Sequence, residues 1–208
     1  MKKLDVEYDL VFIIDCLPQE QRNEYKISED LMAFLASKGV KQLQAKCNNK
    51  AMFLETFSYM NKLADSGLKF CLQIVSHGSE EGLWLHETEI DIFWDEFQKQ
   101  LYDLNKKLSN TLILNMTCCR GLNGMKIIDE NAVEYPFFGL IGCNRDLEVG
   151  EGRITNEKFY TKLLEGKDIS VIVPEIQKEF TESGSSDIFI YCMSSEAYKT
   201  IKNVLGKS

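Results

Sequence analysis

The sequence predicts an α/β fold in three layers, with a mostly parallel central sheet and helices on both faces. Short apolar runs alternate along the chain with segments whose apolar residues recur every three or four positions, the pattern of strands followed by amphipathic helices. Strands that alternate with helices imply crossover connections and hence parallel pairing. The chain has 208 residues, 44% of them hydrophobic, and no Pro/Gly/Ser-rich linker divides it. We therefore expect one domain over residues 1–208.

In the first half of the chain, strands are expected at residues 8–15, 40–46 and 68–75, and helices at residues 27–37 and about 50–65. Leu31, Phe34 and Leu35 fall on one face of the first helix. Gly39 follows that helix, where a residue in the left-handed conformation is expected to end it. A hairpin is expected around residues 82–90.

In the second half, the longest apolar pattern predicts a helix through Phe93, Phe97, Leu101, Leu104 and Leu108. Strands are expected at residues 111–116, 137–143 and 187–193, helices at 156–164 and 170–180, and a short helix after Ser194. This order continues the alternation of strand and helix that predicts the layered fold.

Composition argues against several classes of protein. The net charge is −8 and no basic stripe is visible, so neither nucleic acid nor an anionic membrane surface is an expected partner. The first apolar run, residues 10–14, is too short for a signal peptide or a membrane span, so a cytoplasmic location is expected. The seven cysteines also fit a reducing compartment. Cys71, Cys143 and Cys192 lie in apolar runs and are interpreted as small buried hydrophobes.

Candidate reactive residues follow two of the apolar runs. The run at residues 70–75 ends in Ser76, His77 and Gly78, and the run at residues 111–116 ends in the segment 117–121, which contains Cys119. Reactive groups of open parallel sheets gather at the carboxyl ends of the strands. One crossover helix separates the two runs, so we expect neighbouring strands, with the thiol of Cys119 and the imidazole of His77 facing each other.

A thiol beside an imidazole suits nucleophilic acyl transfer, with Cys119 as nucleophile and His77 as general acid and base. The backbone N–H groups of Gly78 and Cys119 are candidates for an oxyanion hole. Taken singly, such a histidine is more often a hydrogen-bonded structural group, and such a cysteine is more often inert. The occurrence of both on adjacent strands, each with a glycine close behind, favours the catalytic interpretation. His86 is interpreted as a surface residue.

These residues carry a family resemblance. His77 with Gly78, and Cys119 with the Arg120-Gly121 pair after it, resemble the clan of caspases, metacaspases, separases and bacterial CHAT peptidases. The caspase signature is Q-A-C-[RQG]-G, with its histidine about 50 residues upstream. Here the interval from 77 to 119 is 42 residues. Cys119 falls on the signature cysteine and Cys118 on its alanine, so the resemblance selects Cys119.

The resemblance extends over nearly the whole chain, since residues 82–85, 137–143 and 159–164 look like segments of CHAT proteins. It implies that Thr117 lines the primary specificity pocket, at the position where caspases have the glutamine of their signature. Because this glutamine is replaced, the caspase preference for a substrate Asp is not implied here. A substrate with a basic side chain would instead need a carboxylate in this pocket, and Asp146 is the preferred candidate. The wider set of charged candidates is Asp146, Glu148 and Glu151 for a basic side chain, and Arg22, Arg145 and Arg153 for an acidic one.

The expected function is that of a cysteine endopeptidase that cuts a protein or peptide substrate through a thioester acyl-enzyme, without metal or cofactor. No C-x-x-C pair and no glycine-rich loop after the first strand are present, so zinc and dinucleotide sites are not expected. Family analogy suggests a bacterial defence or cell-death pathway and an activating partner protein, with residues 122–136 moving or being cut. The alternatives are a catalytically silent caspase-like scaffold and a redox sensor that uses Cys118 and Cys119.

Overall fold

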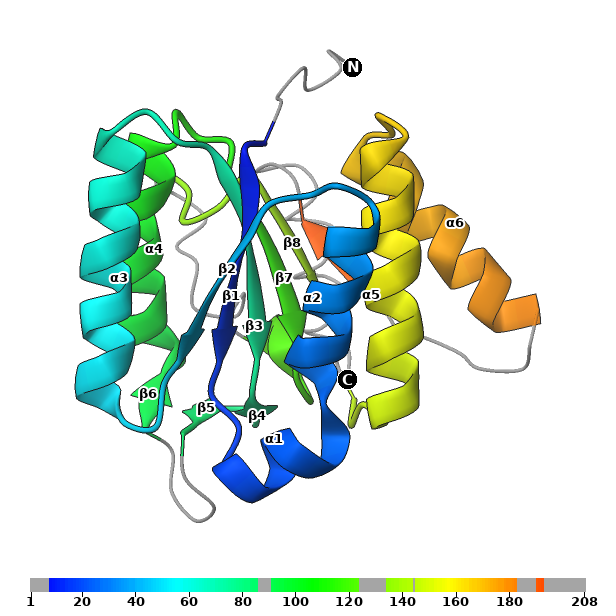
Figure 1. Ribbon diagram of the computed structural model, residues 1–208, viewed down its shortest axis with the longest axis horizontal. Helices are drawn as coiled ribbons and strands as arrows, with labels where there is room; N and C mark the ends of the chain where they lie inside the picture. The colour runs from blue at the N-terminus through cyan, green and yellow to red at the C-terminus, as the bar shows by residue number, and fades with distance from the viewer. Residues whose placement is uncertain (1–7, 86–90, 124–133, 144, 183–189, 193–208) are drawn as a thin grey trace.

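A central six-stranded sheet organises the molecule (Figure 1). The computed structural model describes residues 8–85, 91–123, 134–143, 145–182 and 190–192. In sheet order the strands are β2 (Gln42–Lys46), β1 (Leu10–Asp15), β3 (Phe70–Val75), β7 (Ile113–Thr117), β8 (Gly139–Gly142) and β9 (Ile190–Cys192). All neighbours are parallel except β8 and β9. The predicted mostly parallel sheet is confirmed.

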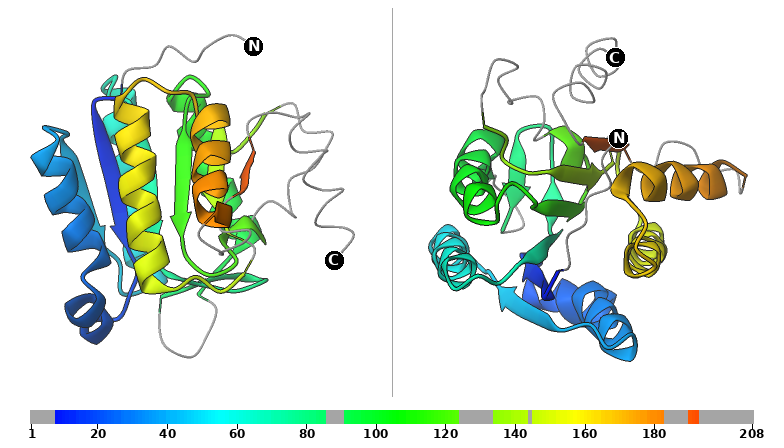
Figure 2. Two further views of the ribbon diagram at one scale, coloured as in Figure 1. Left: turned by 90° about the vertical axis from the view of Figure 1, so that its right-hand side faces the viewer. Right: turned by 90° about the horizontal axis from the view of Figure 1, so that it is seen from above.

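Helices cover both faces of this sheet and complete three layers (Figure 2). One face carries α3 (Lys50–Asp65) and α4 (Trp94–Lys107), whose apolar residues pack in one cluster with alternate residues of the strands. The other face carries α2 (Ile27–Ser37), α5 (Val149–Leu164) and α6 (Ile169–Glu182), which pack with the intervening strand residues. The α/β fold class is therefore confirmed.

Burial on both faces explains the composition of the strands. Every residue of β1 and β3 is buried, as expected for parallel strands with helices on both sides. Cys71 and Cys143 are buried as predicted, and burial raises the pKa of the Cys71 thiol. The side chain of Cys192 lies outside the described part of the chain.

The boundaries expected from the sequence agree best with the structure where the apolar periodicity is strong. The helices expected at residues 27–37 and 50–65 are α2 and α3, and Gly39 has the expected positive φ of 73°. Two predictions were incomplete. The helix α1 (Gln19–Tyr25) was not expected, and α5 begins seven residues before the expected residue 156. The glycines Gly150 and Gly152 in the first turn of α5 weaken the helical signal.

A small antiparallel sheet of β4 (His77–Gly78), β5 (Gly82–Trp84) and β6 (Ile92–Phe93) follows β3. It confirms the expected hairpin, although residues 86–90, with His86, lie outside the described residues. The short helix after Ser194 and most of residues 122–136 also lie outside them. Within the ranges that the structure describes, no helix is both long and apolar enough to cross a membrane.

A buried ion pair closes the carboxyl end of β1. Arg22 Nε lies 3.1 Å from Asp15 Oδ1, and Arg22 Nη2 donates to the carbonyl oxygens of Asp15 and Cys47 at 3.0 and 3.4 Å. Asp15 also accepts the Leu17 N–H and the Ser28 hydroxyl, at 3.0 and 2.7 Å. These contacts join β1, β2, α1 and α2. Arg22 is therefore committed to the interior rather than to an anion site for substrate.

Replacing Asp15 by Ala is expected to lower the free energy of unfolding by about 3–5 kcal/mol, because the Arg22 guanidinium is left buried without its carboxylate. Asp30→Ala is the matched control. Asp30 Oδ2 lies 2.6 Å from Arg153 Nη2 in an exposed pair, whose loss should cost at most about 1 kcal/mol. Urea unfolding followed by circular dichroism measures both. Equal losses would contradict the importance of the buried pair.

Candidate active site

Strand register brings the two candidate reactive residues to the same edge of the sheet. In the pairing of β3 with β7, Val75 lies opposite Thr117. His77 and Cys119 each follow two residues later, His77 in β4 and Cys119 in the loop after β7. The expectation that the two strands are sheet neighbours is confirmed.

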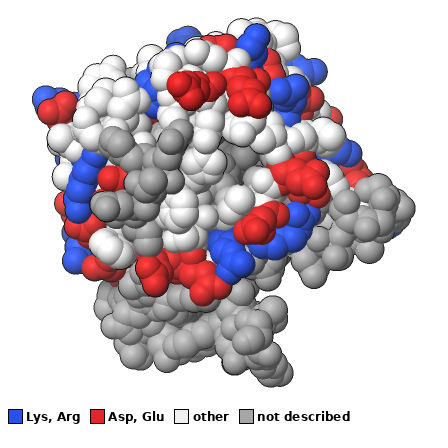
Figure 3. Space-filling view, turned by 90° about the horizontal axis from the view of Figure 1, so that it is seen from below, with Lys and Arg blue, Asp and Glu red and all other residues white. Residues whose placement is uncertain are grey.

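The side chains of His77 and Cys119 line one cavity at this edge, with a free volume of about 60 Å³. The cavity walls come from the loop after β1, from α1 and the start of α2, from Ser76 with β4, from the end of β7 with the loop after it, and from the chain at the start of α5. Figure 3 shows this face of the molecule, where uncharged atoms lie centrally and acidic and basic side chains gather around them. The structure therefore places both candidate residues in the lining of one cavity.

The two adjacent cysteines have different surroundings. Cys118 is buried, and a Cβ placed on Gly78 or Gly121 would lie 3.1 or 3.0 Å from its sulfur. Its thiol therefore fills the space between two glycines, and burial raises its pKa well above the ordinary value. Cys119 is partly exposed and lines the cavity. Of the two, Cys119 is the accessible thiol.

The sulfur of Cys119 accepts a hydrogen bond from the chain that leads into α5. The Leu147 N–H donates to Cys119 Sγ at 3.3 Å, and the Leu147 carbonyl oxygen lies 3.9 Å from the same sulfur. An N–H group directed at sulfur stabilises negative charge there. This contact suits a nucleophile that reacts as its thiolate.

A tight turn follows Cys119. Arg120 has a φ of 52°, in the left-handed region that residues with a side chain seldom adopt. Its N–H donates to the Arg145 carbonyl at 3.0 Å, and its own carbonyl accepts the Asn123 N–H at 2.9 Å. The side chain of Arg120 forms ion pairs with Glu80 and Asp146. These bonds hold the turn in place behind the thiol.

Gly78 is needed for the approach of the two loops. A Cβ at this position would lie 2.2 Å from the carbonyl oxygen of Cys119. Real Cβ atoms do not come so close, so only glycine lets β4 pack against the loop after β7. The use of the Gly78 and Cys119 amides as an oxyanion hole stays a prediction.

Of the predicted substrate contacts, Thr117 lines the cavity and Asp146 does not. The Thr117 hydroxyl belongs to a buried polar cluster, since it accepts from Gln73 Nε2 at 2.6 Å and donates to Asn156 Oδ1 at 3.0 Å. Gly152 of α5 packs against its methyl group. Asp146 is exposed, 3.5 Å from Arg120 Nε, and its contact with substrate stays a prediction.

The other charged candidates have partners within the protein. Arg145 Nη2 lies 2.8 Å from Glu151 Oε1, and this contact holds the pKa of the Glu151 carboxyl below its usual value. Arg153 pairs with Asp30. Glu148 and Glu151 form a capping box at the start of α5. These charges therefore serve the fold around the cavity.

Sequence reasoning missed one residue of the site, Gln21 on α1. Its Oε1 lies 2.5 Å from His77 Nε2. The helix that carries it has only seven residues and an almost entirely polar sequence, so no apolar periodicity marks it. Pro18 immediately before a run of good helix formers was the available signal.

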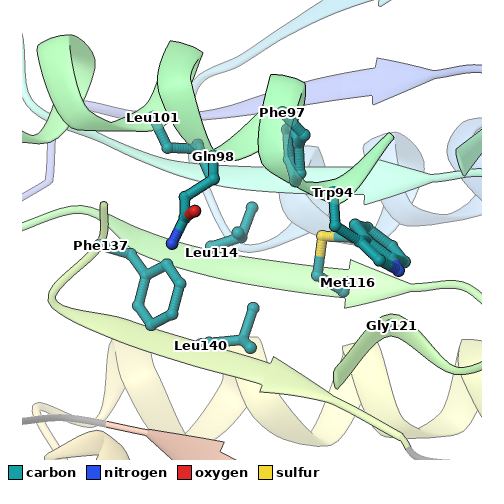
Figure 4. Close-up of a pocket in the computed structure, with 9 residues that line it drawn as sticks. All are labelled: Trp94, Phe97, Gln98, Leu101, Leu114, Met116, Gly121, Phe137 and Leu140. Carbon is teal, nitrogen blue, oxygen red and sulfur yellow. The ribbon is translucent and has the colours of Figure 1, made fainter. Parts of the chain in front are cut away.

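A second hollow lies beneath α4 and is a less suitable site (Figure 4). Phe97, Leu114 and Leu140 line it, and its free volume of about 10 Å³ matches a single water site. Neither Trp94 Nε1 nor Gln98 Nε2 has a hydrogen-bond partner among the described residues, which fits a water there. In the same described ranges, no group of three or more His, Cys, Asp or Glu side chains is placed to hold a metal ion.

Iodoacetamide at neutral pH is expected to label Cys119 first, because its sulfur is accessible while that of Cys118 is buried with a raised pKa. The pKa of Cys47 is lowered to about 7 by hydrogen bonds with Cys16 and Thr56, but this side chain is fully buried and should react later. Timed peptide mapping by mass spectrometry measures the order. Cys118→Ala should keep the fast reaction, and earlier labelling of Cys118 would contradict this assignment.

Gly78→Ala is expected to lower the thermal midpoint and to slow the labelling of Cys119, since the new Cβ must displace the Cys119 carbonyl. Gly150→Ala is the control, because a Cβ there meets nothing within 4 Å. In a helix this exchange should stabilise by roughly 0.5–1 kcal/mol. Calorimetry and timed labelling of both variants give the comparison. A harmless Gly78→Ala would contradict the close approach of the loops.

Comparisons with known proteins support the fold. No family model matches the chain, and no curated protein matches it. Among solved structures, pro-sf-caspase-1 is similar over 91% of this chain and 92% of that chain, with a TM-score of 0.51 and 13% sequence identity. A radical S-adenosylmethionine methyltransferase, TsrM from Kitasatospora setae, has a TM-score of 0.46 and 12% identity. That match covers 79% of this chain, which spans 27% of the methyltransferase, and it supports no inference about function. The chain has a caspase-like fold.

Proposed function

We propose that this protein is a cysteine endopeptidase. The observation that carries the proposal is the shared cavity of Cys119 and His77 at the carboxyl ends of two adjacent parallel strands. The partial exposure of Cys119 and the Leu147 N–H at its sulfur support a nucleophilic role. The caspase-like fold is consistent with peptidase chemistry.

In the proposed reaction the Cys119 thiolate adds to the carbonyl carbon of the scissile peptide bond. The oxyanion that forms accepts hydrogen bonds from the amides of Gly78 and Cys119. The His77 imidazolium gives its proton to the leaving amine as the C–N bond breaks, which leaves a thioester on Cys119. His77 then removes a proton from water, the resulting hydroxide adds to the thioester, and the thiolate departs with release of the acid product.

The cavity wall favours an apolar substrate side chain beside the scissile bond. Leu17, Ile27, Leu147 and Val149 contribute to the wall. Apart from His77, whose imidazole takes part in the proposed reaction, Glu148 is the one carboxylate or basic side chain in the described part of the lining, and it caps α5. Burying an acidic or basic side chain against such a wall would carry a desolvation cost without a dedicated partner. We therefore include a preference for apolar residues in the proposal, where the sequence had left the choice between a basic and an Asp preference open.

The rest of a peptide has room next to the cavity. An open groove of about 380 Å³ begins at Gly78, and its walls include Glu80, Glu81, Trp84 and Arg120. A groove of this kind suits an extended segment of a protein substrate. A closer relation to CHAT peptidases, an activating partner and a role in bacterial defence are proposals that rest on the sequence resemblance alone.

Cleavage of a positional peptide library by the purified protein is expected, with apolar residues preferred before the scissile bond. Cys119→Ala and His77→Ala should each lower kcat/KM by at least about 100-fold, since each removes a reacting group. Cys118→Ala, the neighbouring control, should retain the specificity and most of the activity. Product analysis by mass spectrometry measures all four proteins.

Activity that survives Cys119→Ala would contradict the assignment of the nucleophile. Cleavage after Asp, Lys or Arg would contradict the apolar preference and leave the dyad intact. The silent scaffold would be favoured by two results together. The wild-type protein would cut no peptide, and its Cys119 would react with iodoacetamide no faster than Cys119 of His77→Ala.

A further inference from the structure

The imidazole of His77 contacts a side chain on α1, a helix separate from the two segments that contain His77 and Cys119. Gln21 Oε1, on α1, lies 2.5 Å from His77 Nε2. An amide oxygen has no proton to give, so in this hydrogen bond the ring nitrogen is the donor. With the Gln21 amide in this orientation, the contact assigns the proton of the neutral His77 ring to Nε2 and the lone pair to Nδ1.

The position of Gln21 is set by its neighbour in the sequence. Arg22 is buried in the ion pair with Asp15, which ties α1 to the end of β1. Gln21, one residue earlier, is only half-buried and reaches toward the cavity edge where His77 lies. The amide of Gln21 is thus presented to the imidazole by a helix that is itself anchored in the interior.

We propose that Gln21 is a positioning residue for the reaction. It holds the imidazole of His77 with Nε2 as donor, so that Nδ1 is the nitrogen that exchanges protons with the Cys119 thiol, the leaving amine and water. When the ring becomes an imidazolium, its Nε2–H still donates to the amide oxygen, which stabilises the charged form. This inference rests on the proposed peptidase function, but its physical core, the state of the imidazole, is measurable without turnover.

Other titratable groups lie near His77 and also influence its measured pKa. The cavity is also lined by Tyr25 from α1, by the thiols of Cys118 and Cys119 from the loop after β7, and by Glu148 from the start of α5. Variants of Gln21 leave all of these in place. A change seen in Gln21 variants and absent from a matched control therefore reports the Gln21 contact itself.

The decisive comparison is Gln21→Glu against Gln19→Glu. Both place one new carboxylate on α1, but Gln19 is exposed and its Nε2 donates to Asn23 Oδ1 at 2.9 Å. Gln21→Glu is expected to raise the pKa of His77, because a carboxylate in hydrogen-bond contact favours the imidazolium, whereas Gln19→Glu should move it far less. Gln21→Met, similar in size without an acceptor, is expected to lower kcat by about 10–100-fold.

The state of the ring is read by NMR of ¹⁵N-histidine-labelled protein. The chain has two histidines, so His86→Gln assigns both sets of resonances. In wild type at high pH, Nε2 should be the protonated nitrogen of His77. For peptide hydrolysis, the alkaline limb of the kcat/KM profile should shift to higher pH in Gln21→Glu, because that limb reports loss of the imidazolium proton.

Either of two results would overturn the proposal. One is a neutral His77 ring protonated at Nδ1 in wild type, and the other is a pKa of His77 that Gln21→Glu changes no more than Gln19→Glu does. If the NMR results are as expected while no variant or wild type cuts any peptide, the contact is established and the peptidase function fails instead. If Gln21→Met is poorly folded by circular dichroism, the comparison of the two Glu variants still decides the question.

Discussion

The buried pairing of Asp15 with Arg22 is the interaction on which the arrangement of the site depends. A charge pair in the interior is tolerated only when its hydrogen bonds are satisfied, and here the carboxylate and guanidinium bind groups from β1, β2, α1 and α2. In many α/β proteins the turn after the first strand holds a ligand. Here the pair ties that turn to the short polar helix that follows, and the helix is held where Gln21 meets His77.

A second constraint is steric and acts between the segments that follow β3 and β7. β4 and the loop after β7 meet with Gly78 against the carbonyl of Cys119, and the sulfur of Cys118 fills the space between Gly78 and Gly121. The two cysteines thereby take opposite roles: one packs the junction, and the other lines the cavity. The vicinal redox pair that the sequence left open does not suit this arrangement, because Cys118 is buried with a raised pKa.

Much of the fold was predictable because buried parallel strands and amphipathic helices leave strong periodic signals. The shared position of the two candidate residues was predictable for a related reason: polar residues directly after apolar runs mark the carboxyl edge of a parallel sheet. The helix α1 and the first turn of α5 were not, since α1 is short and polar and Gly152 of α5 is a poor helix former. Both are held by contacts with residues outside the helix itself, Arg22 with Asp15 and Gly152 with Thr117.

By itself the sequence determined the α/β class, the order of strands and helices, and the candidacy of His77 and Cys119, because these follow from local patterns of apolar and polar residues. Only the tertiary structure decided which cysteine is accessible, which charges are already paired, and which side chain meets the imidazole. Those properties depend on distances between residues far apart in the chain. The contact of Gln21 with His77 spans 56 positions, and no local pattern encodes a separation of that kind.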